Sequence, residues 1–203
     1  MVVLAGGASR RFGADKLAAD LGGRPVLARC LEAVAAALPG SPVVVVGPAA
    51  RARGAGGADV VSEDPPGSGP AAGVLAGARH LAGTAAPGVV AVVPGDAPWA
   101  GSALPALVAA LGPRTDGGPD AAVAVAPDGR RQHLLLAVRA EHLARHAPGK
   151  LAGAPARALV EGLRVALVAV DEREALDVDD REALLLARAR LGDPGRGGPP
   201  SVR

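Results

Sequence analysis

Aromatic residues are almost absent from this chain of 203 residues: Phe12 and Trp99 are the only two, and no tyrosine occurs. The chain therefore lacks the aromatic platforms on which proteins stack single-stranded nucleic acid. Its one cysteine, Cys30, excludes an intramolecular disulfide and a cysteine-ligated zinc site. The 22 basic and 20 acidic residues leave a net charge of only +2, which argues against a protein that coats nucleic acid.

Long apolar segments are lacking as well. Glycine, proline or charged residues interrupt the apolar runs well before the roughly 20 residues that a transmembrane helix needs. The first seven residues also lack the basic region of a signal peptide. We therefore expect no membrane partner and a cytoplasmic location. The 49% content of hydrophobic residues predicts one folded domain over residues 1–191, followed by a flexible Gly/Pro-rich tail over 192–203.

Short β-branched runs alternate along the chain with alanine- and leucine-rich stretches of helical length. The predicted strands cover residues 2–4, 43–46, 60–61, 89–93, 121–126, 134–138 and 165–170. The predicted helices cover residues 25–38, 71–81, 103–111, 157–163 and 180–191. This alternation predicts an α/β protein with a largely parallel sheet and helices on both faces. Such sheets bind ligands at the carboxyl ends of their strands.

Glycine and basic residues follow the first strand, in the stretch LAGGASRRFGADK at residues 4–16. Glycines permit close backbone approach, so that successive N–H groups can converge on an anion. Arg11 and Lys16 add positive charge for a polyphosphate. The stretch has neither the Gly-Lys-Ser/Thr of a Walker A loop nor the spacing of a dinucleotide fingerprint. On residue chemistry alone, a phosphate-binding loop and a plain glycine-rich turn both remain open.

Charged residues follow other predicted strands. Asp96 comes directly after the strand 89–93, where it could hold Mg²⁺ against phosphate oxygens or cap the next turn. Before the last helix, Asp179 with Glu182 three residues later predicts a capping box. A compatible alternative is that Asp177 or Asp179 borders an acceptor or a second metal. Arg130 or Arg131 could hold an acceptor phosphate by a bidentate contact, or both could belong to a solvated basic turn.

The stretch 4–16 resembles the signature L-A-G-G-x-S-x-R-x-G-x-D-K of the MobA-like NTP transferases, nucleotidyltransferases similar to the molybdenum cofactor guanylyltransferase. Every fixed position of the signature matches, and Phe12 stands where the family usually has Met. The resemblance implies a Rossmann-like three-layer α/β/α sandwich with a mostly parallel mixed sheet, of the nucleotide-diphospho-sugar transferase type. It also implies an NTP substrate and a Mg²⁺ cofactor.

The resemblance further implies roles for individual residues. They are Leu4, Ala5, Gly6, Gly7, Lys16, Asp64, Gly69 and Asp96 in nucleotide binding; Arg11, Lys16 and Asp96 in catalysis; Asp96 as the ligand of Mg²⁺; and Arg131, Asp177 and Asp179 on the acceptor side. Guanylyltransferases of this type often have Asn where this chain has Val46. The identity of the base therefore stays open.

The leading hypothesis is Mg²⁺-dependent nucleotidyl transfer, in which an acceptor phosphate attacks the α-phosphorus of an NTP and pyrophosphate leaves. The resemblance favours GTP as donor and molybdopterin as acceptor. A second hypothesis keeps this chemistry with CTP and molybdopterin, or with a sugar-1-phosphate or phospholactate acceptor. A third is a non-catalytic nucleotide-binding partner protein. The presence of both Lys16 and Asp96 favours an enzyme, because positioning and charge neutralisation are what phosphoryl chemistry requires.

Overall fold

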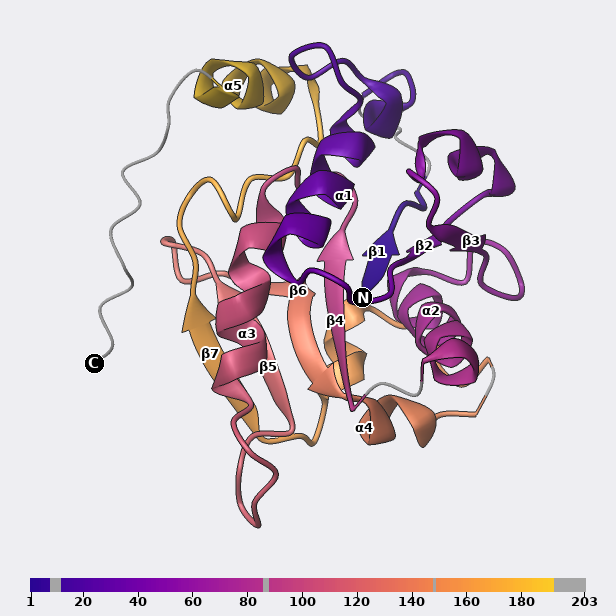
Figure 1. Cartoon of the computed structure of the whole chain (residues 1–203), viewed down its shortest axis with the longest axis vertical. Coiled ribbons are helices and arrows are strands. Elements are labelled where there is room, and N and C mark those ends of the chain that lie inside the picture. Colours follow the sequence, from indigo (N-terminus) through magenta and orange to yellow (C-terminus); the bar gives the residue numbers. More distant parts are fainter. Residues whose placement is uncertain (8–11, 86–87, 148, 192–203) are drawn as a thin grey trace.

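Seven strands form one mixed sheet in the order β3-β2-β1-β4-β6-β5-β7 in a computed structural model, which describes residues 1–7, 12–85, 88–147 and 149–191. The strands are β1 (Val2–Leu4), β2 (Val44–Val46), β3 (Asp59–Val61), β4 (Val89–Pro94), β5 (Ala121–Val125), β6 (Arg131–Arg139) and β7 (Val165–Ala169). β1, β2, β3 and β4 run parallel, β7 runs parallel to β5, and β6 is antiparallel to both β4 and β5. Figure 1 shows β1 and β4 ending toward the top of the view and β6 ending toward the bottom.

Helices cover both faces of this sheet (Figure 1). They are α1 (Val26–Ala37), α2 (Pro70–Thr84), α3 (Leu104–Ala110), α4 (Ala140–Ala144) and α5 (Arg181–Leu191). One apolar cluster joins side chains of α1 and α3 to the sheet, and a second cluster joins side chains of α2 and α4 to its other face. A third cluster packs α5 against Leu21 and Val26. The predicted three-layer α/β/α sandwich is confirmed.

Valine side chains fill the centre of the core, where aromatic side chains are missing. Val2 and Val3 are both fully buried, yet their side chains belong to the clusters on opposite faces of the sheet. Val44 and Val45 of the neighbouring strand divide in the same way. Because helices cover both faces of these strands, their residues form a continuous apolar run in the sequence.

The structure corrects several predicted elements. β6 extends from Arg131 to Arg139 and so begins three residues before the predicted strand 134–138. The predicted helix 157–163 is a 3-10 helix, η4 (Ala156–Val160). α4 was not predicted, because five residues are too short for a helical period to show. The predicted tail, 192–203, lies outside the described residues. Among the described helices, none is long and apolar enough to cross a bilayer.

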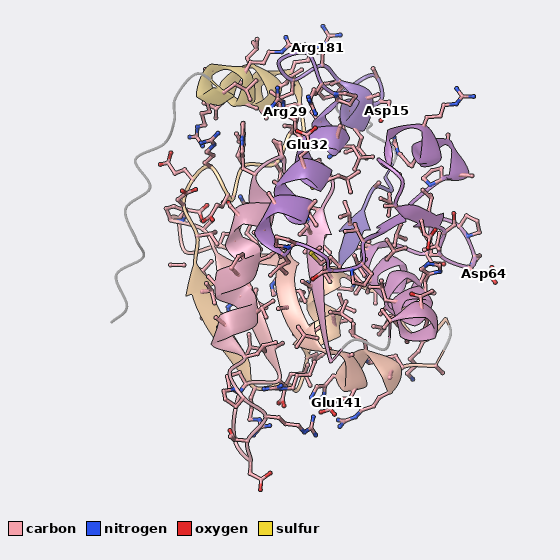
Figure 2. The ribbon with its side chains drawn as sticks, viewed as in Figure 1. Asp15, Arg29, Glu32, Asp64, Glu141 and Arg181 are labelled. Carbon is pink, nitrogen blue, oxygen red and sulfur yellow. The ribbon has the colours of Figure 1, made fainter. Side chains whose placement is uncertain are left out.

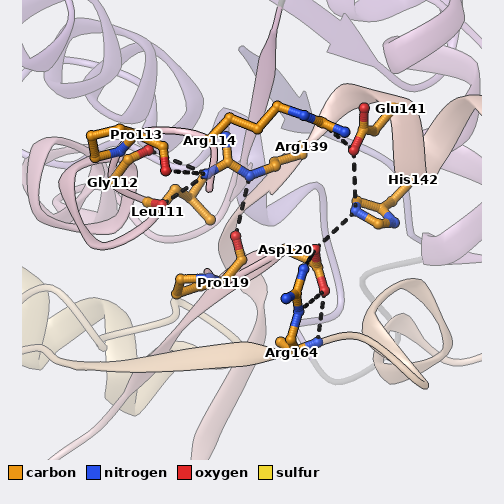
Figure 3. A network of polar contacts seen from close by, with 10 residues as sticks. All are labelled: Leu111, Gly112, Pro113, Arg114, Pro119, Asp120, Arg139, Glu141, His142 and Arg164. Carbon is orange, nitrogen blue, oxygen red and sulfur yellow. Dashed lines mark hydrogen bonds and ion pairs between the residues drawn. The ribbon is translucent and has the colours of Figure 1, made fainter. Parts of the chain in front are cut away.

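A polar network closes the sheet at the edge opposite the carboxyl ends of the parallel strands (Figure 3). Asp120, just before β5, accepts hydrogen bonds from Nε and Nη2 of Arg164 at 2.9 and 2.8 Å. These bonds hold the pKa of the Asp120 carboxyl well below its usual range. Arg139 donates to the backbone carbonyls of Leu111 at 2.8 Å and Pro119 at 3.2 Å. Because Asp120, Arg139 and Arg164 find their hydrogen-bond partners within the protein, we assign these three side chains a structural role.

Glycine sets the distance between α2 and the sheet. A Cβ atom at Gly77 would lie 2.8 Å from Cγ1 of Val2 and 2.9 Å from Cγ2 of Val46. Both methyl groups belong to stiff β-branched side chains on buried strands, so they have little room to move. Gly83, in the last turn of the same helix, has no heavy atom within 4 Å of the corresponding position.

We predict opposite effects of alanine at these two positions of α2. Gly77→Ala should lower the free energy of unfolding by about 1–3 kcal/mol, because the added methyl overpacks the contact with β1 and β2. Gly83→Ala is the matched control and should be neutral or stabilising by up to about 1 kcal/mol, because alanine favours the helix. Urea unfolding of both variants measures the difference. Equal effects would show that α2 does not depend on this close approach.

Candidate functional site

At the edge of the sheet where β1, β2 and β4 end, backbone segments approach each other closely at two places. The N–H of Gly95 donates to the carbonyl of Leu4 at 2.8 Å, and the N–H of Ala5 donates to the carbonyl of Val46 at 2.7 Å. A Cβ atom at Gly95 would lie 2.8 Å from the carbonyl oxygen of Leu4, and one at Gly47 would lie 2.8 Å from that of Ala5. Only glycine permits these distances, so the strand ends can lie close together and leave a crevice above them.

Lys16 enters this crevice from the 3-10 helix η1 (Lys16–Ala18). The carboxylate of Asp15 caps η1 by accepting from the N–H of Leu17 at 3.1 Å, and it also pairs with Arg51. Arg51 in turn donates from Nε to the carbonyl of Ala5 at 3.0 Å. These contacts hold the segment that carries Lys16 against the end of β1.

The ammonium group of Lys16 lies between two carboxylates. It pairs with Oδ2 of Asp96, which follows β4, and with Oδ1 of Asp179 at 2.7 Å. Burial lowers the pKa of Lys16, but the hydrogen bonds to Asp179 and Asp96 outweigh it and raise this pKa above its ordinary value. The Lys16 and Asp96 side chains are 14% and 19% exposed, whereas that of Asp179 is 54% exposed. Lys16 is therefore a permanent cation at a partly desolvated position.

A third carboxylate completes the cluster. The N–H of Val178 donates to the carbonyl of Asp96 at 2.9 Å, which holds the segment around Asp177 against the end of β4. Burial, followed by the negative charges of Asp96 and Asp179, raises the pKa of Asp177 to about 7. The two carboxylates of Asp96 and Asp179 exceed the one ammonium of Lys16 in charge, and at Asp177 their negative charges outweigh the positive charge of Arg130. Such a surface favours a cation.

A cavity of about 460 Å³ opens beside this cluster, within the size range of small-molecule sites. Its walls include five of the residues predicted to bind the nucleotide: Leu4, Gly6, Gly7, Gly69 and Asp96. The other lining residues are Val46, Glu63, Gly67, Pro70, Gly73, Pro94 and Leu134. Backbone of the glycine loop and the carboxylate of Asp96 thus face the same space.

Several of the predicted site residues do not line this cavity. Ala5 is fully buried behind the cavity. Asp64 is exposed and does not line the cavity, and Figure 2 shows it at the outer edge of the molecule. Arg131 lines a different cavity. Arg11 falls outside the described residues.

Glu63 lines the cavity instead of its neighbour Asp64, and its Oε1 accepts from the N–H of Gly67 at 3.1 Å. The sequence contains Glu63 and Asp64 side by side, so it offers two carboxylates for one position. Which of them faces inward depends on the path of the loop, which no periodic pattern reports.

The predicted capping box before α5 does not form, and the N-cap lies one residue later than predicted. Asp180, not Asp179, accepts from the N–H of the third helical residue, Ala183, at 2.8 Å, as an N-cap side chain does. Asp179 is therefore free of the helix and reaches Lys16. The capping interpretation of Asp179 is wrong, because the helix begins one residue later than predicted, at Arg181.

Residues 1–173 match the family model described as the MobA-like NTP transferase domain. The chain belongs to the MobA-like NTP transferase family. This membership covers the glycine loop, the cavity and Asp96, and it supports nucleotidyl transfer as the activity. No protein with a curated description matches the chain.

Solved structures with the same fold cover nearly the whole chain. The molybdopterin-guanine dinucleotide biosynthesis protein A from Archaeoglobus fulgidus is 22% identical with a TM-score of 0.67, and the match covers 94% of this chain and 97% of that one. The Rv0371c homologue from Mycobacterium sp. strain JC1 is 25% identical with a TM-score of 0.71, over 94% and 96%. The manganese complex of Rv0371c from Mycobacterium tuberculosis is 20% identical with a TM-score of 0.61, over 93% and 96%.

The raised pKa of Asp177 predicts how stability depends on pH. In the unfolded chain this carboxyl ionises near its ordinary value of 3.8, whereas in the folded protein it ionises near 7. Between these values the unfolded state releases the proton and the folded state keeps it, so stability falls as pH rises. Asp177→Asn should remove this fall and raise the free energy of unfolding at pH 8 by about 1–3 kcal/mol.

Urea unfolding of both proteins at pH 5 and pH 8, with EDTA present, measures this effect. The matched control is Asp180→Asn, which removes a carboxylate from the same segment without touching the cluster. A pH dependence that survives in Asp177→Asn would show that another group causes it.

Proposed function

We propose that this protein transfers a nucleotidyl group from an NTP, with GTP favoured, to the phosphate of molybdopterin, and that Mg²⁺ is the cofactor. The observation that carries the proposal is the ion pair of Lys16 with Asp96, a residue that lines the same cavity as Gly6 and Gly7 of the glycine loop. Backbone N–H groups, an ammonium and a carboxylate are the groups that position a triphosphate and neutralise its charge.

The donor set fits Mg²⁺. Among residues that the structure describes, no three His, Cys, Asp or Glu side chains are arranged to hold a metal by themselves. Mg²⁺ in nucleotide sites takes only one or two carboxylates, and phosphate oxygens and waters complete its octahedron. Asp96 and Asp179 already converge on one cation, the ammonium of Lys16. We propose that these two carboxylates hold Mg²⁺, which when bound would neutralise charge that develops on the phosphates.

The chain's own residues then have separate tasks. The backbone of Leu4, Gly6 and Gly7 would hold the nucleotide, as proposed from the signature, and Gly69 would allow close approach on the opposite wall. Lys16 would bind the phosphate oxygens and stabilise the leaving pyrophosphate. Arg11 is proposed for the same charge neutralisation. Asp177 would border the acceptor, whose phosphate attacks the α-phosphorus in line.

Glu63 supports guanine as the base. The side chain of Val46, where the family often has Asn, offers no hydrogen bond to a base. The Glu63 carboxylate lines the same cavity, and its two oxygens are acceptors. Guanine presents neighbouring N1–H and N2–H₂ donors, which two acceptor oxygens can satisfy together, whereas cytosine presents only its N4–H₂ group. CTP therefore remains the second candidate donor and belongs in the test.

The test is binding and turnover with each nucleotide. GTP with Mg²⁺ should raise the Tm of the protein more than CTP, UTP or ATP does, because a ligand that binds only the folded state stabilises it. Pyrophosphate should appear when molybdopterin is added. A larger shift with CTP would keep the chemistry and change the base. Tm shifts without pyrophosphate from any acceptor would favour the non-catalytic partner instead.

Replacing Lys16 separates binding from chemistry. Lys16→Ala should slow pyrophosphate release at least about a hundredfold, because a group that stabilises the transition state is lost. The chain contains one other lysine, the exposed Lys150, so Lys150→Ala is the matched control and should release pyrophosphate at the wild-type rate. Comparable rates for the two variants would remove Lys16 from the mechanism.

A further inference from the structure

A second cavity, of about 430 Å³, lies over β5, β6 and β7 beside the 3-10 helix η4. Its floor is apolar and consists of Val123, Val160, Leu163 and Val165, which belong to or pack against the cluster under α2. Its remaining lining residues are Arg131, His133, Arg157 and Glu161. An apolar floor with a basic rim is suited to an organic anion.

The basic rim is not neutralised by the protein. Neither Arg131 nor Arg157 forms an ion pair with a residue that the structure describes, and Glu161 pairs with neither of them. Burial lowers the pKa of His133, and the charges of Arg131 and Arg157 lower it further, so both guanidinium groups act on one imidazole. Nδ1 of that ring is buried without a hydrogen-bond partner among the described residues. The guanidinium groups of Arg131 and Arg157, both exposed, are therefore open to an anion from solution.

Two chain connections join this cavity to the nucleotide cavity. The first is β6, in which His133 lines one cavity and the next residue, Leu134, lines the other. The pairing of β5 with β6 shifts here: Val123 faces Leu136, but Ala124 faces Gln132. Regular alternation would place His133 and Leu134 on opposite faces of the sheet, but both cavities lie on the face that α2 covers. The irregularity lets both neighbours open to that face.

The second connection runs from the wall of the nucleotide cavity to η4. The N–H of Gly153 donates to the carbonyl of Ser68 at 2.7 Å, and the carbonyl oxygen of Ala154 lies 3.8 Å from the position of a Cβ atom at Gly69. Two residues later the chain enters η4, which carries Arg157. The loop that holds Gly69 in place thus also sets the position of the basic rim.

We propose that Arg131, His133 and Arg157 form an anion subsite for the acceptor, and that this subsite holds a second anionic group of the acceptor: the dithiolate of molybdopterin, or the carboxylate of a phospholactate-type acceptor. The inference rests on the proposed function, because only a transferase has an acceptor. The attacking phosphate must reach the α-phosphorus beside Asp96, so a rim in the adjoining cavity binds a different group of the same molecule. Guanidinium forks suit oxyanions, and the apolar floor suits the body that joins the two groups.

Inorganic phosphate and the imidazole of His133 test the subsite directly in the full chain. Phosphate should shift the His133 ring signal in NMR saturably and raise the pKa of His133, because it offsets the charge of both guanidinium groups. The ring signals of His80, His142 and His146 should not follow the same curve. Sodium chloride at equal ionic strength is the control, and an equal effect of chloride would mean screening only and overturn the subsite.

Variants assign the effect to the rim. Arg131→Gln and Arg157→Gln should each weaken phosphate binding at His133 at least about tenfold, because each removes a charge-assisted contact. The exposed Arg145, outside this cavity, provides the matched control: Arg145→Gln should leave the affinity unchanged. Unchanged signals of the other histidines verify that each variant is folded. Wild-type affinity in both rim variants would overturn the proposal.

The same titration with GTP and Mg²⁺ present distinguishes an acceptor subsite from a part of the nucleotide site. Phosphate and nucleotide should bind together. Displacement of phosphate from His133 by GTP would assign the rim to the nucleotide and overturn the acceptor subsite. The NMR measurement requires no turnover, so it is independent of the activity assay. An absence of pyrophosphate release would refute the proposed function, whereas an absence of phosphate binding at His133 would refute the subsite.

Discussion

The ion pairs of Lys16 with Asp96 and Asp179 are the interaction on which the site depends. They join residues 80 and 163 positions apart in the chain, and they bring the glycine loop, the end of β4 and the segment before α5 to one point. The carboxylates of Asp96 and Asp179 meet there, and two like charges in such proximity repel unless a cation lies between them. Lys16 supplies that cation in the protein alone. A bound nucleotide would draw Lys16 toward its phosphates, which leaves the carboxylates available for Mg²⁺. The ion pairs that hold these segments together in the folded protein thus involve the same side chains as the proposed chemistry.

The packing of small residues makes this meeting possible. Gly47 and Gly95 let backbone segments approach at the strand ends, and Gly77 lets α2 lie directly on β1 and β2. A core of valine, leucine and alanine fills the two layers without aromatic side chains. The crevice is therefore made of backbone and short side chains, and the chemistry depends on a few long ones that enter from separate segments. The two cavities share β6 and the loop before η4, so the proposed acceptor subsite is positioned by the same elements as the nucleotide cavity.

Several parts of this arrangement could be predicted from the sequence. The valine runs at residues 43–46 and 89–93 predict buried strands, because a strand covered on both faces must be apolar throughout. The glycine loop and Asp96 follow such strands directly, and parallel strands bring their carboxyl ends to one edge. Short elements were less predictable: α4 is too short to show a period, and the start of β6 contains polar residues that do not alternate. The resemblance implies Asp64, whereas Glu63 lines the cavity, and adjacent loop residues carry no periodic signal of direction that distinguishes them.

The sequence by itself determined the fold class, the family signature and the chemical groups available for a triphosphate. These are local properties, since strand period, glycine spacing and residue chemistry are read within a few positions. Only the tertiary structure decided which carboxylates meet Lys16, that Asp180 rather than Asp179 caps α5, and that Arg131 lies beside Arg157 and His133 in a cavity of its own. Such decisions depend on loop paths and on contacts across the chain, where burial and charge pairing are settled between residues that are distant in sequence.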